Sequence, residues 1–509
     1  MINKTKEFIK KRWLLIYSFI TAALVLLFCS KSSPLYPMND WVDVQCFLTL
    51  GKGMLNGMVP YVDLYEQKGP VLYFIYAIVA LFSNRSMFGQ YLLEIITYGL
   101  FLYFSAKLAE IYLGNSKLLH LIVPVLAAIV ATTRAFCHGG SVEQMSLFLF
   151  VYGLYSVIKA CHENRPLTFR EALTNGIFAG IALWIKYTML GFYLGLALFV
   201  LIWYIGWVRS FKKLLAVIGQ FLLGIAAVSA VVFIYFLYVG GLDELFTCYF
   251  YNNIFLYPSE SDIPKLTQIW ESFQRAMKYN EIFPTYLYIG LGWLVIRIHK
   301  GVRDLLAAVL TFTGLVIGTY MGAGYVYYAL VLCAFTVFGL IGIAWVLLQI
   351  KAETFLKEIT CTDQVINGIL VATVLILCTV WAFNNSDNTY LMRYDREDLP
   401  QYQFADIITE TEDPTILNFG FLDGGFYHAA DVLPNCPFFC TFNINAPGMW
   451  QTQYEYINQG KVDYVITRRY RLEQYNVDSS NYELVDTANL YFEGIDFTYY
   501  LYRLKGVNQ

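Results

Sequence analysis

The chain has 509 residues, of which 58% are hydrophobic and only 14% are charged, and its mean hydropathy is +0.50. A soluble protein of this length would carry roughly a quarter charged residues, so the composition predicts a polytopic α-helical membrane protein. The formal net charge of −3 argues against a nucleic-acid surface, which would need a basic patch. The ten cysteines are too few for a disulfide scaffold and form no zinc-binding pattern.

The first apolar segment, 13–30, follows a basic stretch between Lys4 and Arg12 and has no cleavage site, which predicts a signal anchor with a cytoplasmic N-terminus. Segment 71–83 is shorter than the roughly 20 residues needed to cross a membrane, so we interpret it as a re-entrant or interfacial helix. A true span there would reverse every later loop. About eleven spans are then predicted, over 13–30, 88–112, 119–134, 144–160, 172–187, 189–207, 214–239, 283–298, 304–321, 325–350 and 365–383.

This assignment places the short basic loops on the cytoplasmic face, among them Arg297–Arg303 and the segment with Lys351 and Lys357. The transmembrane catalytic domain is predicted over 1–383, with outer loops 31–87, 135–143 and 240–282. The last of these, with Ser259-Glu-Ser-Asp262, is either a lid or a solvated connector.

Residues 384–509 are more polar, and their short β-rich runs alternate with helical segments. This pattern predicts a small extracytoplasmic α/β domain. It could be a structural cap or could help to hold an acceptor. Cys436 and Cys440 lie close enough in sequence to form a disulfide if this domain is outside the cytoplasm, and the sequence leaves that open.

Acids beside membrane spans are costly and suggest function, and Asp40 and Asp43 follow the first span directly. If a helix has already begun there, the two would share one face, three residues apart. We interpret Asp40 as a helix cap or a solvated residue. Asp43 is the predicted catalytic acid, partly because of the family resemblance described below.

The second half of the loop reads Pro60-Tyr61-Val-Asp63-Leu-Tyr-Glu66-Gln-Lys68-Gly-Pro70. Asp63 and Glu66 could hold the Lys68 ammonium, in a functional site or in an ordinary interfacial salt bridge. Lys68 precedes a short membrane-facing helix, and a compact ammonium at that depth suits a lipid phosphate.

A second group of candidates lies in and near the outer loop after the third span. Glu143 opens the next helix, where the helix dipole favours an acid. Arg134 and Lys186 are phosphate contacts or snorkelling residues. His138 and Tyr327 complete the predicted site; Tyr327 belongs to an aromatic run that could line a sugar or lipid groove or form an aromatic belt.

With these motifs the chain resembles bacterial GT-C glycosyltransferases, the branch with protein O-mannosyltransferases and the lipid A aminoarabinose transferase. The resemblance rests on Asp43 with its spacing to Gly51, on Gly57-x-x-Pro-Tyr-x-Asp63, on Glu66-Gln-Lys68-Gly-Pro70, on Glu143 and on the outer α/β tail. It implies a GT-C fold and a polyprenyl-phosphate-linked sugar donor. Lys68 matches the lysine that faces the lipid phosphate, although Lys-Gly-Pro replaces the frequent Lys-Pro-Pro. Tyr327 stands where relatives often have a histidine.

The resemblance implies that Asp43 is the general base and that Lys68, with Lys186 or Arg134, stabilises the leaving phosphate, with inversion at the anomeric carbon. Glu143 would orient the acceptor or hold a divalent ion, but relatives with monophosphate donors often need no metal, so none is predicted. The acceptor would be a lipid, glycan or protein hydroxyl at the outer face of a bacterial cytoplasmic membrane. Two alternatives are a transporter or flippase of a lipid-linked saccharide, and an anchor that presents the C-terminal domain.

Overall fold

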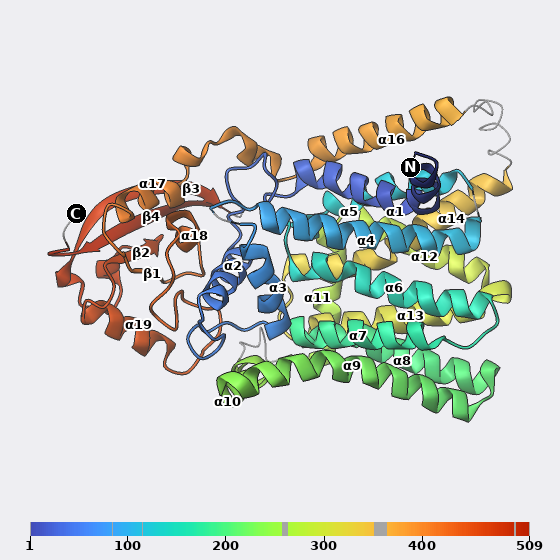
Figure 1. Cartoon of the computed structure of the whole chain (residues 1–509), viewed down its shortest axis with the longest axis horizontal. Coiled ribbons are helices and arrows are strands. Elements are labelled where there is room, and N and C mark those ends of the chain that lie inside the picture. Colours follow the sequence, from blue (N-terminus) through green and yellow to red (C-terminus); the bar gives the residue numbers. More distant parts are fainter. Residues whose placement is uncertain are drawn as a thin grey trace. The chain divides into compact units, whose positions relative to one another are not determined.

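The computed structural model describes residues 2–83, 85–114, 116–256, 263–350, 364–492 and 495–507 (Figure 1). The predicted lid motif at 259–262 and the basic pair Lys351 and Lys357 lie outside these residues. The chain forms two compact units, each built from three separate segments. The first unit comprises Met1–Ser30, Tyr91–Ser229 and Ser261–Thr389, and the second comprises Lys31–Gln90, Ala230–Glu260 and Tyr390–Gln509.

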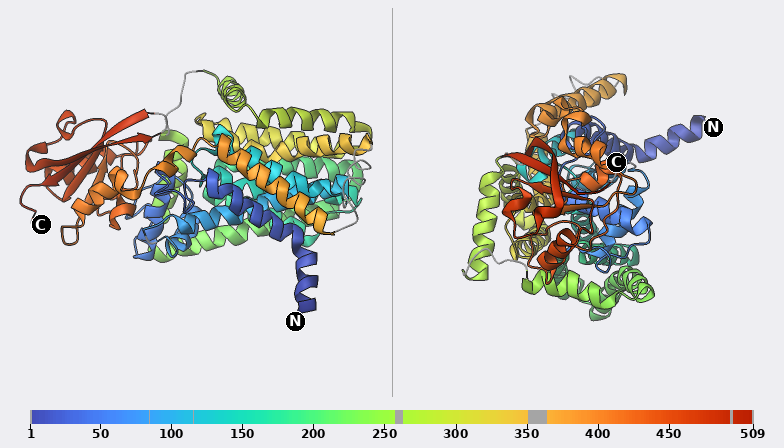
Figure 2. Two further views of the ribbon diagram at one scale, coloured as in Figure 1. Left: turned by 90° about the horizontal axis from the view of Figure 1, so that it is seen from above. Right: turned by 90° about the vertical axis from the view of Figure 1, so that its left-hand side faces the viewer.

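The first unit is a bundle of long helices that run side by side in Figures 1 and 2. A helix stands at each of the eleven predicted spans. They are α1 (Ile2–Cys29), α4 (Phe88–Leu113), α5 (Leu118–Ala131), α6 (Val142–His162), α7 (Phe169–Ile185), α8 (Leu190–Trp203), α9 (Phe211–Val239, which ends in the second unit), α12 (Phe283–Ile296), α13 (Ile298–Tyr320), the 3-10 helix η5 (Val326–Phe335) continued by α14 (Thr336–Gln349), and α16 (Gln364–Asn385).

Within the described part of the chain, eight helical stretches are long and apolar enough to cross a membrane, and three shorter apolar helices accompany them. The chain is thus a multi-pass membrane protein. An amphipathic helix, α11 (Lys265–Tyr279), precedes α12. The bundle is held by close approach of small residues, as expected where lipid offers apolar side chains no contrast. A Cβ at Gly191 of α8 would lie 2.1 Å from the carbonyl oxygen of Gly314 in α13, so these two helices pack backbone to backbone.

Basic residues gather at one end of this bundle. His162 at the end of α6 lies 2.8 Å from Asp304 of α13. Arg165 binds Glu171 at the start of α7 through the two terminal nitrogens of its guanidinium group. Thr168 caps α7 in a capping box with Glu171. This is the end that the positive-inside rule predicts to be cytoplasmic.

The second unit contains a four-stranded sheet of order β1-β2-β4-β3. The strands are β1 (Ile416–Phe419), β2 (Tyr464–Arg468), β3 (Tyr482–Phe492) and β4 (Ile495–Leu504). β1 and β2 are parallel and are joined through α19 (Met449–Asn458), whereas β3 and β4 form an antiparallel hairpin that pairs with β2. With α17 (Pro400–Ile408) and α18 (Phe426–Ala430), this is the small C-terminal α/β fold that the sequence predicts.

Two short helices from the segment 31–87, the predicted first outer loop, belong to the same unit as the sheet. They are α2 (Val42–Leu55) and α3 (Pro70–Ala80). With eleven residues, α3 is about 16 Å long, which is too short to cross a membrane. A Cβ at Gly51 would lie 2.4 Å from the Tyr76 carbonyl group, so the glycine lets α2 and α3 touch. The segment 230–260 adds α10 (Leu242–Glu244) and the π-helix η4 (Leu245–Leu256).

Candidate functional site

Asp43 lies in the first turn of α2 and is partly exposed. Trp41 occupies the N-cap position and makes no side-chain cap, and the positive end of the helix dipole here favours a carboxylate. Phe47 follows one turn later and therefore lies on the same face of the helix as Asp43. Its ring packs edge-on against Tyr76 of α3, with ring centres 5.4 Å apart.

Lys68 stands just before α3, where Gly69 takes the N-cap position and Pro70 starts the helix. Its ammonium nitrogen lies 5.7 Å from the centre of the Phe47 ring. Since Phe47 shares its face of α2 with Asp43, the structure brings the predicted base and the predicted phosphate-binding lysine to the same side of α2. Lys68 is partly exposed, as a ligand contact requires.

Asp40 is neither a cap nor solvated, so that prediction is wrong. Its carboxylate lies 2.9 Å from the Lys31 ammonium, and both side chains are 1% exposed. Lys31 also donates a hydrogen bond of 3.1 Å to the hydroxyl of Tyr390. Burial lowers the pKa of Lys31, but the Asp40 carboxylate and the Tyr390 hydroxyl together outweigh burial and raise the pKa above its ordinary value. Asp40 is thus half of a buried ion pair.

Glu66 and Asp63 bind backbone groups, and neither forms an ion pair with Lys68, contrary to the prediction. Glu66 accepts hydrogen bonds from the Lys68 backbone N–H (2.7 Å) and from the hydroxyl of Tyr73. Tyr61 donates to the carbonyl oxygen of Lys68 (2.5 Å). Asp63 accepts from a backbone N–H four residues earlier (2.7 Å). These contacts fix the main chain at Lys68 and leave its ammonium on the Phe47 side.

Gln67 was not singled out from the sequence, yet it ties the loop to two other segments of the second unit. Its side-chain amide donates to Asn443 (2.8 Å), and its carbonyl oxygen accepts from Asn253 of η4 (2.7 Å). Next to it, the Tyr65 backbone N–H donates to the carbonyl oxygen of Pro437 (2.9 Å). The loop before Lys68 is therefore anchored on both sides.

In the first unit, Glu143 lies in the first turn of α6, whose N-cap is Ser141. It is buried and lies 2.7 Å from the ammonium of Lys186, the residue that ends α7 in an extended conformation. The same ammonium sits 3.4 Å from the centre of the Tyr328 ring. Lys186 therefore bridges an acid and an aromatic face, an arrangement that suits a partly buried cation.

The other predicted residues of this group lie close by in sequence but play different parts. Arg134 begins a short 3-10 helix, η1 (Arg134–Phe136), and is exposed, whereas His138 is buried in the following turn. The ring of Tyr327 stacks on Tyr325, with centres 5.9 Å apart, and the contact with Lys186 is made by Tyr328.

Glu94 of α4, a buried acid within a predicted span, has a neutral polar partner. It accepts a hydrogen bond of 3.1 Å from Gln144, the residue after Glu143, and Gln144 in turn accepts from the backbone N–H of Gly140 (2.8 Å). Sequence reasoning passed over Gln144. Its only signal is the first-turn position next to Glu143.

The cysteines and acids give no sign of a bonded or metallated centre within the described residues. Cys436 and Cys440 are both free thiols, and the sulfur of Cys440 lies 3.9 Å from that of Cys46 in α2. The described ranges hold no group of three or more His, Cys, Asp or Glu side chains that could bind a metal ion.

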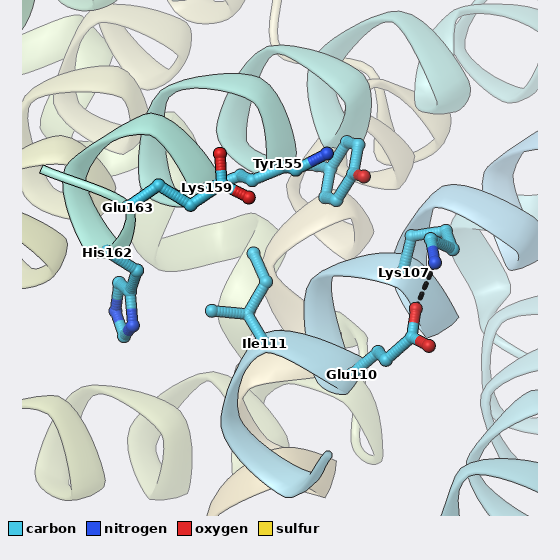
Figure 3. Close-up of a pocket in the computed structure, with 7 residues that line it drawn as sticks. All are labelled: Lys107, Glu110, Ile111, Tyr155, Lys159, His162 and Glu163. Carbon is cyan, nitrogen blue, oxygen red and sulfur yellow. Dashed lines mark hydrogen bonds and ion pairs between the residues drawn. The ribbon is translucent and has the colours of Figure 1, made fainter. Parts of the chain in front are cut away.

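A separate pocket of about 220 Å³ lies at the opposite end of the first unit (Figure 3). It lies between the ends of α4 and α6 and is lined by Lys107, Glu110, Ile111, Tyr155, Lys159, His162 and Glu163. Lys107 and Glu110 form an ion pair there. Along α6, His162 is about 28 Å from Glu143, so this pocket contains none of the predicted site residues.

No family model matches the sequence, and no curated protein does. Two crystal structures of ArnT from Cupriavidus metallidurans match the fold along the entire chain. The one bound to undecaprenyl phosphate covers 98% of this chain and 99% of that chain at 13% identity, with a TM-score of 0.58. The apo structure covers 97% and 98% at 11% identity, with a TM-score of 0.56. An oligosaccharyltransferase from Archaeoglobus fulgidus covers 90% and 70% at 13% identity, with a TM-score of 0.48, which is too low to support a shared fold. The chain therefore has the fold of these ArnT structures, and the fold expected from the resemblance is confirmed.

Proposed function

We propose that this chain is a glycosyltransferase that moves a sugar from a polyprenyl-phosphate-linked donor to an acceptor hydroxyl at the outer face of the cytoplasmic membrane. The observation that carries the proposal is the placement of Asp43, Phe47 and Lys68 on one side of α2. The fold adds support, because it matches an ArnT structure bound to undecaprenyl phosphate.

The transfer needs a base for the acceptor and a cation for the leaving group. Asp43, partly exposed at the helix start, would take the proton of the acceptor hydroxyl as its oxygen attacks the anomeric carbon. The bond from that carbon to the phosphate oxygen breaks, and Lys68 would stabilise the charge that grows on the phosphate. Attack opposite the leaving group inverts the anomeric centre.

Lys68 is a better candidate for the donor phosphate than Lys186. Lys186 is already held by Glu143 at 2.7 Å and by the ring of Tyr328, so a phosphate contact would require it to exchange partners. Glu143 is likewise held by Lys186, which favours a role in orienting groups around it. We assign no metal to the reaction, and this is tested by transfer in the presence of a chelator.

A transporter or flippase should place its charged groups near the middle of its spans. In the described part of the first unit, the ion pairs lie at helix ends, with Glu143–Lys186 at one end and His162–Asp304 at the other. This arrangement favours the enzyme over the transporter.

The proposal is tested by transfer from labelled polyprenyl-phosphate sugars into membranes that hold wild type or Asp43→Asn. Loss of a general base reduces rates by roughly 10²- to 10⁴-fold. A matched control is Glu455→Gln in α19, which removes an exposed carboxylate paired with Lys461. It should leave transfer unchanged. Equal transfer by wild type and Asp43→Asn would remove Asp43 from the mechanism. Reporter fusions after residues 85 and 140 test the orientation, and a cytoplasmic signal at 140 would contradict an outer site.

A further inference from the structure

We propose that the C-terminal α/β fold positions α2, and with it Asp43, and that Asp423 is the positioning residue through which it does so. The proposal deepens the proposed function and rests on it, because it gives the C-terminal segment a role in the same site.

The helix α2 packs against other parts of the unit on two faces. At 100° per residue, Phe47 and Gly51 lie toward Asp43 and face α3. Thr49 and Lys52 lie about 120° and 180° round the helix from Asp43. The second face is the one that meets residues 418–440 of the α/β fold.

Asp423 makes the central contact on this second face. It is fully buried, and its carboxylate accepts a hydrogen bond of 2.6 Å from the hydroxyl of Thr49. The carboxylate also accepts two hydrogen bonds from its own fold. The donors are the side-chain amide of Asn418 on β1 (3.0 Å) and the backbone N–H of Gly425 (2.8 Å). A buried carboxylate with three donors is held in one place, and removing one donor or the carboxylate is costly.

The loop of Asp423 lies against α2 so closely that only glycine fits at its end. Gly425 has a φ of +90°, and a Cβ there would lie 3.1 Å from the side chain of Gln45 and 2.9 Å from the sulfur of Met38. A flanking contact, Lys52 with Asp431 (3.0 Å), is partly exposed and therefore weaker. The buried sulfurs of Cys46 and Cys440, 3.9 Å apart, close the remaining side.

This docking has a consequence for the reaction, because α2 is a short helix whose N-terminal turn carries Asp43. A rigid helix transmits a shift at Thr49 to its first turn, and a misplacement of about 1 Å at a reacting group can cost about 10²-fold in rate. The Asp423 carboxylate binds Thr49, Asn418 and Gly425, so it acts on the reaction through the position of the helix.

The first test measures whether α2 stays packed on the α/β fold, without measuring sugar transfer. In wild-type protein, Cys46 is 2% exposed and burial raises the pKa of its thiol, so it should react slowly with a maleimide. We expect Asp423→Ala and Thr49→Val to increase labelling of Cys46 on the order of tenfold, measured by mass spectrometry of the Cys46 peptide after digestion. Thr49→Ser, which keeps the hydroxyl, should label like wild type.

The control is Thr411→Val. It removes another buried hydroxyl of the same fold, 2.7 Å from the hydroxyl of Tyr464, but on a segment that does not meet α2. It should lower thermal stability about as much as Thr49→Val without exposing Cys46. If Thr411→Val exposes Cys46 equally, or if Asp423→Ala and Thr49→Val leave it protected, Asp423 does not dock α2.

The second test measures whether the position of α2 affects the rate of transfer. With a polyprenyl-phosphate sugar as donor, Thr49→Val should reduce kcat on the order of tenfold, with the donor KM changed by less than about twofold, and Thr49→Ser should restore the rate. An unchanged kcat in a variant that exposes Cys46 would overturn the positioning role. If wild type transfers no sugar from any such donor, the proposed function fails, and the labelling of Cys46 still decides whether Asp423 holds α2.

Discussion

The ion pair between Lys31 and Asp40 predicts a large and specific loss of stability when only one partner is removed. Both side chains are 1% exposed, and the two charged atoms are 2.9 Å apart. Asp40→Asn leaves a buried ammonium hydrogen-bonded to the Tyr390 hydroxyl but without its carboxylate, and Lys31→Met leaves a buried carboxylate. Breaking a buried pair in this way costs about 3–5 kcal/mol, whereas replacing both partners with apolar groups is often neutral.

We therefore expect each single variant to be destabilised by about 3 kcal/mol or more, and the double variant Lys31→Met/Asp40→Asn by much less than their sum. Because the pKa of Lys31 is raised, its share of the stability is fully present below about pH 10.5 and is lost only as the pH rises through the raised pKa. The measurement is the free energy of opening from the reactivity of the buried Cys46 thiol across a urea titration at pH 7.5.

The matched control is the partly exposed pair of Lys52 and Asp431, whose side chains are 13% and 38% exposed. Lys52→Met should cost less than about 1 kcal/mol, because exposed pairs are screened by water. If Asp40→Asn costs no more than Lys52→Met, the reasoning from burial is refuted. Asp43→Asn gives the opposite pattern: normal stability with lost transfer. A shared phenotype for Asp40→Asn and Asp43→Asn would mean that the two acids do not have separate roles.

Three further outcomes follow from the described contacts. Burial raises the pKa of Asp423 from 3.8 to about 6. This group therefore contributes about 3 kcal/mol of stability that is fully present below about pH 4 and is lost as the pH rises through 6. Asp423→Asn should flatten this pH dependence of the unfolding free energy, measured at pH 4.5 and 7.5. Gly51→Ala should cost about 1–3 kcal/mol, because its Cβ would meet the Tyr76 carbonyl group at 2.4 Å; unchanged unfolding would show that α2 and α3 separate freely. Glu143→Gln should destabilise the first unit by about 3 kcal/mol in SDS unfolding, and adding Lys186→Met should recover part of it; additive losses would rule out coupling of this pair.

The fold was predictable where a local pattern determines it. Long apolar segments gave the helices of the first unit because each must satisfy its own backbone inside a membrane. The short length of 71–83 gave a helix, α3, that cannot span. Alternating β-rich and helical runs gave the sheet of the second unit. Hydropathy does not show which of these segments pack together, so the grouping of 31–90 with 390–509 was not foreseen.

The candidate site was predictable in its residues and less so in their contacts. Thr49 and Gln67 bind Asp423 and Asn443, which are separated from them by 374 and 376 residues, and no local pattern links them. Tyr328, whose ring contacts Lys186, was missed because the resemblance directed attention to Tyr327, the position where relatives often have a histidine. A family position does not show which of two neighbouring rings meets a lysine on another helix.

Asp40 and Asp43 show how the starting residue of a helix can give two neighbouring acids different surroundings. Had the helix begun before Asp40, the two acids would have shared one face, and either could have served as base. The helix begins at Val42, so Asp40 lies in the extended chain before it, where its side chain is free to turn away from the face of Asp43 and meet Lys31. A signal for this existed: Lys31 is a basic residue on the predicted outer side of the first span, where the positive-inside rule expects few. A lysine in that place needs an acid partner, and Asp40 fills that need, so the proposed role of general base is assigned to Asp43 rather than to Asp40.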